Sequence, residues 1–152
     1  MTKKNQSTMS KRRHEARRAG LKILYQWQLN ESMSRNMFTD FIAENSMKEV
    51  DVDYLQLLFL GVTERLSEID ALLTPVVDRK LPTLNPVELA ALRLAAFEFM
   101  HCIEIPYKII INESIELVKE FGAEGGYKYI NGVLDKLATS LRKVEVTSAS
   151  EK

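Results

Sequence analysis

The chain has 152 residues, of which 45% are hydrophobic, and its 21 Lys and Arg residues balance its 21 Asp and Glu residues. This length suits one domain with a sizeable core, since such a domain buries roughly 70% of the surface that its unfolded chain exposes. The composition is that of an ordinary globular protein, and no apolar run approaches the ~18 residues of a membrane span, which excludes a membrane-spanning helix.

A single cysteine and two histidines limit the available chemistry. Because Cys102 is alone, the chain forms no intrachain disulfide, which fits a reducing cytoplasm. His14 and His101 are too few and too far apart for a zinc site. The N-terminus lacks the apolar core of a secretory signal. We therefore expect a cytoplasmic protein that holds no metal and no other cofactor.

The first half of the chain predicts a polar tail followed by four helices. Residues 1–10 are expected to form a disordered basic tail. Ser10 can cap a helix over residues 11–30, whose apolar residues recur at helical spacing: Ala16, Ala19, Ile23, Leu24 and Trp27. Three shorter helices are expected at residues 36–45, 54–66 and 67–77. The helix at 54–66 is apolar on all sides, which predicts a place in the core.

The second half begins with the strongest helix start in the chain, Asn-Pro-Val-Glu at residues 85–88. Asn85 suits the N-cap and Pro86 the first helical position, so an apolar core helix is expected from there to residue 101. Pro106 then begins a helix that runs to residue 121. A strand over residues 107–111 is the rival interpretation, but no second strand-like run exists to pair with it.

A last helix is expected over residues 126–141, and residues 143–152 are expected to form a polar tail. Gly132 inside that helix costs ~1 kcal/mol relative to Ala, which predicts a close approach to a neighbouring helix. The sequence thus predicts one all-α domain of about seven helices over residues 11–142.

The charges are distributed unevenly along the chain. The first 24 residues carry eight positive side chains and one negative, a net charge of +7, while the other 128 carry 13 positive and 20 negative, a net charge of −7. A cationic end on an acidic body attracts polyanions, so nucleic acid is the first partner to consider.

The geometry of the first helix predicts how this basic segment faces solvent. At 100° per residue, Tyr25 lies on the side opposite Ala16, and Lys11, His14 and Arg18 fall within about 40° of it. Cations suit phosphates, and an exposed ring suits an unpaired base. In the rival interpretation Tyr25 packs against another helix and the arginines are merely solvated.

Several segments together carry a resemblance to a known family. They are VELAALRLAAFE at residues 87–98, IPYK at 105–108, INESIELVK at 111–119, FGAE at 121–124, YINGVLDK at 129–136, RRHEAR at 12–17 and ILYQWQL at 23–29. In order and spacing they resemble the signatures of the NusB family of bacterial transcription antitermination factors. The resemblance covers about residues 11–142.

The resemblance implies one compact domain of two small helical subdomains, without enzymatic activity. It also implies binding of the boxA RNA of ribosomal RNA leader transcripts with ribosomal protein S-ten (NusE), and assembly with other Nus factors on elongating RNA polymerase. The basic first helix is the family's RNA-binding element, which here implicates Lys11, Arg12, Arg13, Arg17, Arg18 and Tyr25. Family aromatics beside that element correspond to Phe121 and Tyr129, although on physical grounds Phe121 also suits a helix-end packing contact.

The remaining expectations concern partners. The acidic surface near Glu88 and Glu104 suits a basic ribosomal protein. Arg93 and Glu98 are expected to make structural hydrogen bonds, and Glu113 and Glu116 to form an acidic helix face. An alternative function is a stand-alone homodimeric RNA-binding scaffold, related to the N-terminal domain of ribosomal RNA cytosine methyltransferases. Binding to boxA RNA with and without the ribosomal partner separates these functions.

Overall fold

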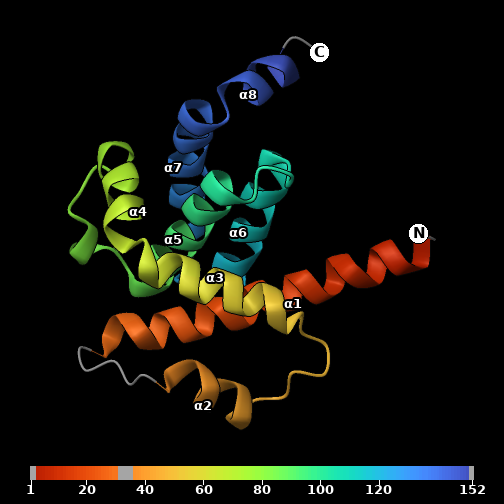
Figure 1. Cartoon of the computed structure of the whole chain (residues 1–152). Helices are drawn as coiled ribbons and strands as arrows, with labels where there is room; N and C mark the ends of the chain where they lie inside the picture. The colour runs from red at the N-terminus through yellow and green to blue at the C-terminus, as the bar shows by residue number, and fades with distance from the viewer. Residues whose placement is uncertain (1–2, 31–35, 151–152) are drawn as a thin grey trace.

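The computed structural model describes the backbone of residues 3–30 and 36–150, and the side chains of residues 8–30 and 36–148. Within these ranges all regular structure is helical, which confirms the predicted all-α class (Figure 1). The elements are α1 (Lys3–Leu29), α2 (Met37–Glu44), α3 (Val52–Glu64), α4 (Leu66–Leu73), the 3-10 helices η1 (Thr74–Val76) and η2 (Leu81–Thr83), α5 (Pro86–His101), α6 (Tyr107–Phe121), α7 (Gly126–Leu141) and α8 (Lys143–Ser150).

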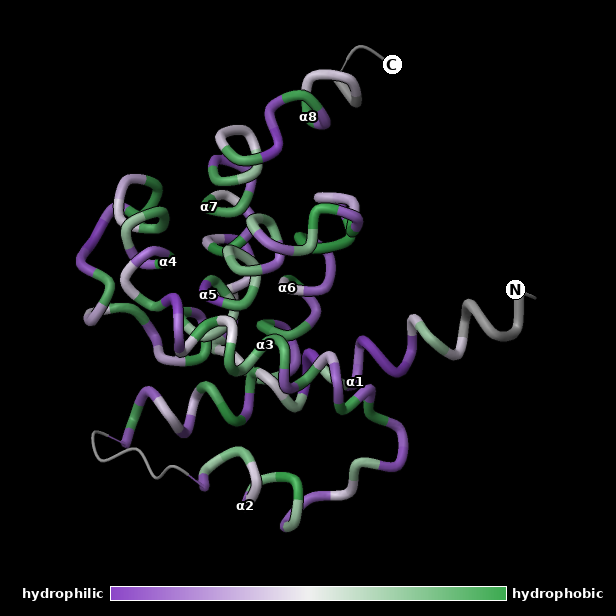
Figure 2. Tube along the Cα trace, in the orientation of Figure 1, coloured by the Kyte–Doolittle hydropathy of each residue, from purple (hydrophilic) through white to green (hydrophobic). Residues whose placement is uncertain are grey.

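Helix α5 lies at the centre of the molecule. Every residue from Leu89 to Phe99 is buried, and the helix packs against α1, α3, α4, α6 and α7. In Figure 1, α1, α2 and α3 lie below α4, α7 and α8. One continuous cluster of buried apolar side chains joins all these helices except α8, so the fold is a single domain. In Figure 2, hydrophobic and hydrophilic residues alternate along α7, as expected for an amphipathic helix.

Both core helices begin with a side-chain cap, and the predicted start of α5 is confirmed. The carboxylate of Asp51 accepts a hydrogen bond from the amide of Tyr54 at 3.0 Å and caps α3. The side chain of Asn85 accepts from the amide of Val87 at 2.9 Å, with Pro86 at the first position of α5. These side chains satisfy amides that have no partner inside the helix. Residues 107–111 are helical, so the strand interpretation was wrong.

Both predicted tails differ from the structure. Helix α1 begins at Lys3, so residues 3–10 are helical rather than disordered; residues 1 and 2 lie outside the described residues. No Gly or Pro interrupts this segment, and extending an existing helix costs far less than starting one. At the other end, residues 143–150 form α8 instead of a frayed tail.

A cluster of hydrogen bonds around Arg142 holds the first turn of α8 against the end of α5 and the start of α6. The guanidinium of Arg142 is buried and donates to the carbonyls of Phe99 and Ile105 at 3.0 and 2.9 Å. It also pairs with Glu145 at 2.8 Å, and Glu145 accepts a hydrogen bond from the amide of Tyr107. Arg142 therefore satisfies carbonyls at the end of α5, while Glu145 satisfies an amide at the start of α6.

The close helix contact predicted at Gly132 is wrong. A Cβ atom at Gly132 would meet no neighbour within 4 Å, because the residue faces solvent. The close approach occurs at Gly61 of α3, where a Cβ would lie 2.3 Å from the ring of Phe97. The absence of a side chain at Gly61 lets α3 lie directly on α5.

Candidate nucleic-acid interface

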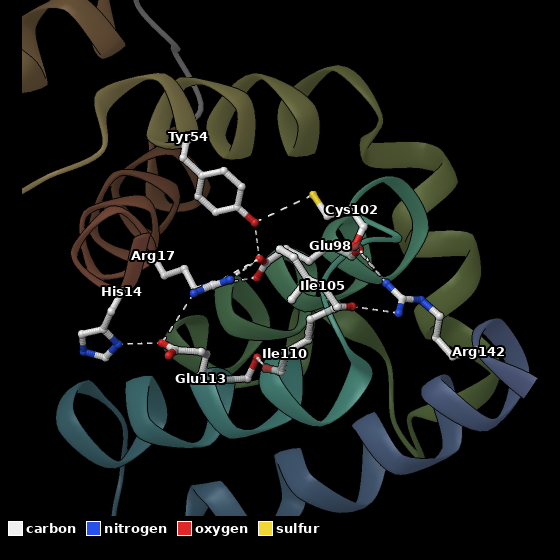
Figure 3. Close-up of polar contacts among 10 residues, drawn as sticks. His14, Arg17, Tyr54, Glu98, Cys102, Ile105, Ile110, Glu113 and Arg142 are labelled. Atoms are coloured by element: carbon white, nitrogen blue, oxygen red, sulfur yellow. Dashed lines mark hydrogen bonds and ion pairs between the residues drawn. The ribbon is translucent and has the colours of Figure 1, made fainter. Parts of the chain in front are cut away.

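The main correction to the predicted interface concerns Arg17. Its side chain is buried, with the residue 4% exposed, and it donates to both carboxylate oxygens of Glu98 at 2.9 to 3.1 Å (Figure 3). The hydroxyl of Tyr54 donates to the same carboxylate. Arg17 lies on the side of α1 that faces α5, and its guanidinium is buried rather than exposed on the predicted RNA surface. It holds helices together instead.

The pKa values of this cluster follow from its burial and pairing. Burial alone would lower the pKa of the Arg17 guanidinium, but Glu98 at hydrogen-bond distance raises it above its ordinary value. Burial, reinforced by the negative charge of Glu98, raises the pKa of Tyr54. Both groups therefore stay protonated at neutral pH, and each can donate to Glu98.

Glu113 extends this cluster to the surface. Its carboxylate lies 2.6 Å from Nδ1 of His14 and 3.8 Å from Nη1 of Arg17 (Figure 3). Glu113 is thus half-buried and paired, in contrast to the expected solvated acidic face, whereas Glu116 is exposed. The side chain of His14 is directed toward Glu113 of α6, so it is not part of the basic surface that the neighbouring cations form.

Three predicted RNA-binding cations of α1, Lys11, Arg12 and Arg13, differ in the contacts that they make within the protein. Lys11 is exposed. Arg12 donates to the carbonyls of Lys48 and Val50 at 3.1 and 2.8 Å, which fastens the segment before α3. The guanidinium of Arg13 lies 4.7 Å from the ring centre of Tyr54 in a cation–π contact, and the Arg13 residue is partly exposed. All three lie in the N-terminal half of α1.

Arg18 and Phe121 come together where α1 crosses the end of α6. Arg18 pairs with Glu15 at 2.8 Å and with Glu120, and these two carboxylates raise its pKa. Arg18 and Lys22 both place their charged groups over the Phe121 ring, at 5.6 and 5.4 Å from its centre. Phe121 is half-buried, so it serves both as a helix-end contact and as part of the surface.

Tyr25 and Phe121 line one cavity. The Tyr25 side of α1 faces outward, as predicted, and the residue is 37% exposed. The cavity has a volume of about 380 Å³, and its lining is Leu21, Lys22, Tyr25, Gln26, Phe41, Asn45, Val87 and Phe121. It combines three aromatic rings (Tyr25, Phe41 and Phe121), one ammonium group and two side-chain amides. The predicted RNA-binding residues did not include Lys22, Gln26 or Asn45. Asn45 directly follows α2, and periodicity in α1 says nothing about that part of the chain.

Tyr129 lies apart from this cavity. Its hydroxyl donates to Asp78 at 3.0 Å, and the guanidinium of Arg79 covers its ring at 4.6 Å from the centre. Partial burial raises its pKa, and the hydrogen bond to Asp78 adds to this effect. Tyr129 therefore belongs to a second cluster, formed by α7 and the loop between η1 and η2.

The two predicted acidic partner residues do not share a surface. Glu88 lies in the first turn of α5 and Glu104 follows its last turn, and the 13 residues from Glu88 to the helix end at His101 span about 20 Å. Glu88 is half-buried against Gly126, and this burial raises its pKa. It adjoins Val87 at the aromatic cavity. Glu104 is exposed, and its role in partner binding stays a prediction.

An exposed apolar surface on α3 was missed by the sequence prediction. Leu57 is 48% exposed, and it lines a shallow cleft of about 410 Å³ with Leu60 between the acidic residues Asp53 and Glu64. An apolar residue on every side of a helix predicts full burial, but here nothing in the described part of the chain covers this face. Ile103, in the turn after α5, is 77% exposed.

Two further features of the described residues bear on function. No group of three or more His, Cys, Asp or Glu residues is arranged to hold a metal ion there. None of the helices in that part of the chain has both the length and the apolar character needed to cross a membrane.

Comparisons with known proteins agree with this geometry. Residues 14–139 match the model of the NusB family. A protein named "Transcription antitermination protein NusB" from Hahella chejuensis is 43% identical over 146 residues, which cover 96% of this chain and 98% of the relative. One of the same name from Coxiella burnetii is 44% identical over 135 residues, which cover 89% and 98%.

Two solved structures share the fold. The chain superposes on T. maritima NusB with a TM-score of 0.74 and 30% identity, over 83% of this chain and 89% of that one. A structure of the antitermination factors NusB and NusE with double-stranded RNA gives a TM-score of 0.74 at 24% identity, over 84% of this chain and 96% of that one.

Proposed function

This chain belongs to the NusB family, and on that premise we propose that it is a non-enzymatic transcription antitermination factor. It binds the boxA RNA of ribosomal RNA leader transcripts together with ribosomal protein S-ten (NusE). With other Nus factors it acts on elongating RNA polymerase in the cytoplasm. The shared name of its relatives supports this role, and the observation that carries it is the aromatic cavity beside the basic surface of α1.

The cavity has the chemistry that unpaired RNA requires. Bases splayed from a single strand stack on aromatic rings, and their edges hydrogen-bond to side-chain amides. Tyr25 and Phe121 supply the rings, and Gln26 and Asn45 supply the amides. Lys22 holds a positive charge over Phe121, where a neighbouring phosphate would be neutralised. The proposed RNA surface is therefore this cavity together with the exposed cations of α1.

Replacing Tyr25 with alanine tests this proposal. We expect Tyr25→Ala to weaken boxA RNA binding by ~1–3 kcal/mol, the usual contribution of a stacked base, and to change the melting temperature little because the ring is exposed. Fluorescence anisotropy with labelled RNA and thermal melts measure the two effects. Tyr107→Ala, at the opposite end of α6, is the control and should keep the affinity. Unchanged RNA affinity of a folded Tyr25→Ala protein would exclude the stacking role.

We assign the ribosomal-protein surface to the outer face of α3 and the adjacent turn after α5. Tyr54 of α3 contacts Cys102 at 3.8 Å, so Ile103 and Glu104 lie next to the start of α3. This surface joins exposed Leu57, Leu60 and Ile103 with the carboxylates of Asp53, Glu64 and Glu104. Apolar anchors within an acidic rim suit a basic protein. Glu88 lies against Gly126 near the other end of α5 and is not part of this surface.

A further inference from the structure

Asp78, Arg79 and Tyr129 form a self-contained cluster on the surface. The carboxylate of Asp78 accepts one hydrogen bond from the hydroxyl of Tyr129 and another from Nε of Arg79, both at 3.0 Å. The guanidinium of Arg79 lies over the Tyr129 ring at 4.6 Å from its centre. Two separate contacts to Asp78 and Tyr129 thus fix the plane of a side chain that would otherwise sample many rotamers.

Arg79 has hydrogen-bond donors that no described residue uses. Its side chain is 52% exposed, and among the described residues none accepts a hydrogen bond from its two terminal nitrogens. A guanidinium stacked on one ring presents its other face to solvent, where a base can stack, while the terminal nitrogens remain free to bind phosphate.

Three lysines lie around the cluster, and the carboxylate of Glu88 also acts electrostatically on Arg79. Lys80 follows Arg79 in the loop, and Lys128 precedes Tyr129; both are exposed. Lys119 of α6 places its ammonium group 4.8 Å from the ring centre of Tyr127. Figure 2 shows the loop that carries Arg79 as hydrophilic along most of its length. Phosphate groups would be attracted to this second basic surface.

Tyr129 does not line the aromatic cavity, but the cluster adjoins that cavity through Val87 and Glu88. Val87 lines that cavity, and the next side chain, Glu88, lies against Gly126 at the start of α7. Tyr129 follows Gly126 by three residues, a rise of about 4.5 Å along the helix. A strand leaving the cavity across the first turn of α7 therefore meets Arg79.

We propose that Arg79, stacked on Tyr129 and positioned by Asp78, is a second RNA contact that binds a nucleotide flanking those held at α1. The base of this nucleotide stacks on the open face of the guanidinium, and its phosphate accepts hydrogen bonds from the terminal nitrogens. This inference rests on the proposed RNA-binding function, and it adds a contact that α1 does not supply.

The test is a titration of the full chain with boxA RNA and with RNAs shortened by one nucleotide at a time from each end. Binding is measured at several salt concentrations for the wild-type protein and for Arg79→Gln. The matched control is Arg65→Gln, because Arg65 is likewise exposed and lies 6.0 Å from the ring centre of Phe97, away from the cavity. Circular dichroism verifies that each variant is folded.

We expect Arg79→Gln to make the slope of log K against log salt less negative by about 0.7, the value for one phosphate on a single strand. The loss should disappear with RNA that lacks the flanking nucleotide, and Arg65→Gln should match the wild type. Tyr129→Leu should weaken binding of the full RNA about fivefold or more, since it removes the support of the stack.

Three outcomes would overturn the inference. An unchanged slope for Arg79→Gln with every RNA would remove Arg79 from the interface, and the effect of Tyr25→Ala would still support the proposed function. An equal loss with every RNA, the shortest included, would show that no separate nucleotide is bound at Arg79. If the wild-type protein bound none of these RNAs, both this inference and the proposed function would fail.

Discussion

At the level of single residues, Glu98 of α5 accepts hydrogen bonds from Arg17 of α1 and Tyr54 of α3, so one buried carboxylate links three helices. Burying a charge is costly unless it is paired and hydrogen-bonded. Glu98 meets both conditions, and no buried side-chain nitrogen or oxygen atom among the described residues lacks a partner. Arg17, although it belongs to the basic segment of the sequence, is therefore a structural residue.

We predict that Arg17→Ala destabilises the fold by about 3–5 kcal/mol, because it leaves the Glu98 carboxylate buried with its main charge partner removed. Urea unfolding followed by circular dichroism measures the loss. Lys11→Ala is the control, since Lys11 is an exposed cation of the same helix. It should leave the stability within about 0.5 kcal/mol while flattening the salt dependence of RNA binding. Equal stability of the two variants would contradict the structural role of Arg17.

The sequence predicted the solvent-facing side of α1 better than it predicted the direction of Arg17, at the edge of the buried side. Helical periodicity placed Tyr25 opposite the buried Ala16, and the structure confirms this. Periodicity placed Arg18 on the Tyr25 side, but it left Arg17 at the edge of the apolar stripe, where an arginine can turn either way. The direction of the Arg17 side chain depends on whether the core holds a carboxylate that can pair with it. That carboxylate belongs to Glu98, which lies 81 residues further along the chain.

Among the helices, glycines mark where two backbones meet, and the structure places this contact at Gly61 rather than at Gly132. The sequence could not decide between them, because both lie inside helices and both cost helix stability in the same way. The missed helix α8 has a related cause. The hydrogen bonds of Arg142 and Glu145 join it to α5 and α6, and they involve backbone groups that no local pattern identifies.

Alanine substitutions at these two glycines should have opposite effects. Gly132→Ala adds a methyl group in open space inside α7, so it should stabilise the protein by about 0.4–1 kcal/mol. Gly61→Ala places the same methyl group 2.3 Å from the Phe97 ring, and it should destabilise the protein by about 1–3 kcal/mol through overpacking. Thermal and chemical unfolding of both variants measures the difference. A stabilising Gly61→Ala would show that α3 can move away from α5 at little cost.

At the scale of the whole molecule, the uneven charge of the sequence places a basic surface on α1 and an acidic surface on α3. The N-terminal part of α1 projects from the body as a cationic helix (Figure 1), and the cavity of Tyr25 and Phe121 lies further along the same helix. The apolar and acidic face of α3 is a different surface, although α3 packs directly against α1. Two ligands of opposite charge, RNA and a basic protein, can therefore bind at the same time and remain close together.

This arrangement predicts that the two ligands strengthen each other's binding. If the ribosomal protein tightens RNA binding by some factor, RNA must tighten ribosomal-protein binding by the same factor, typically about 5- to 150-fold for coupled sites. Leu57→Asp should weaken ribosomal-protein binding about tenfold or more, as loss of a central apolar contact does, while RNA binding by the protein alone stays unchanged. Ile109→Asp is the control, because Ile109 is an exposed apolar residue on α6.

Titrations of RNA into the pure protein and into the preformed complex, at several protein concentrations, give both affinities and the mechanism of coupling. A composite RNA surface made by both proteins keeps the enhancement at every concentration. A homodimer that masks α1 and dissociates when the partner binds gives an enhancement that fades on dilution, because dilution separates the dimer without help. Mutually exclusive binding of RNA and the ribosomal protein would contradict the proposed assembly, since the two surfaces would then have to overlap on α1.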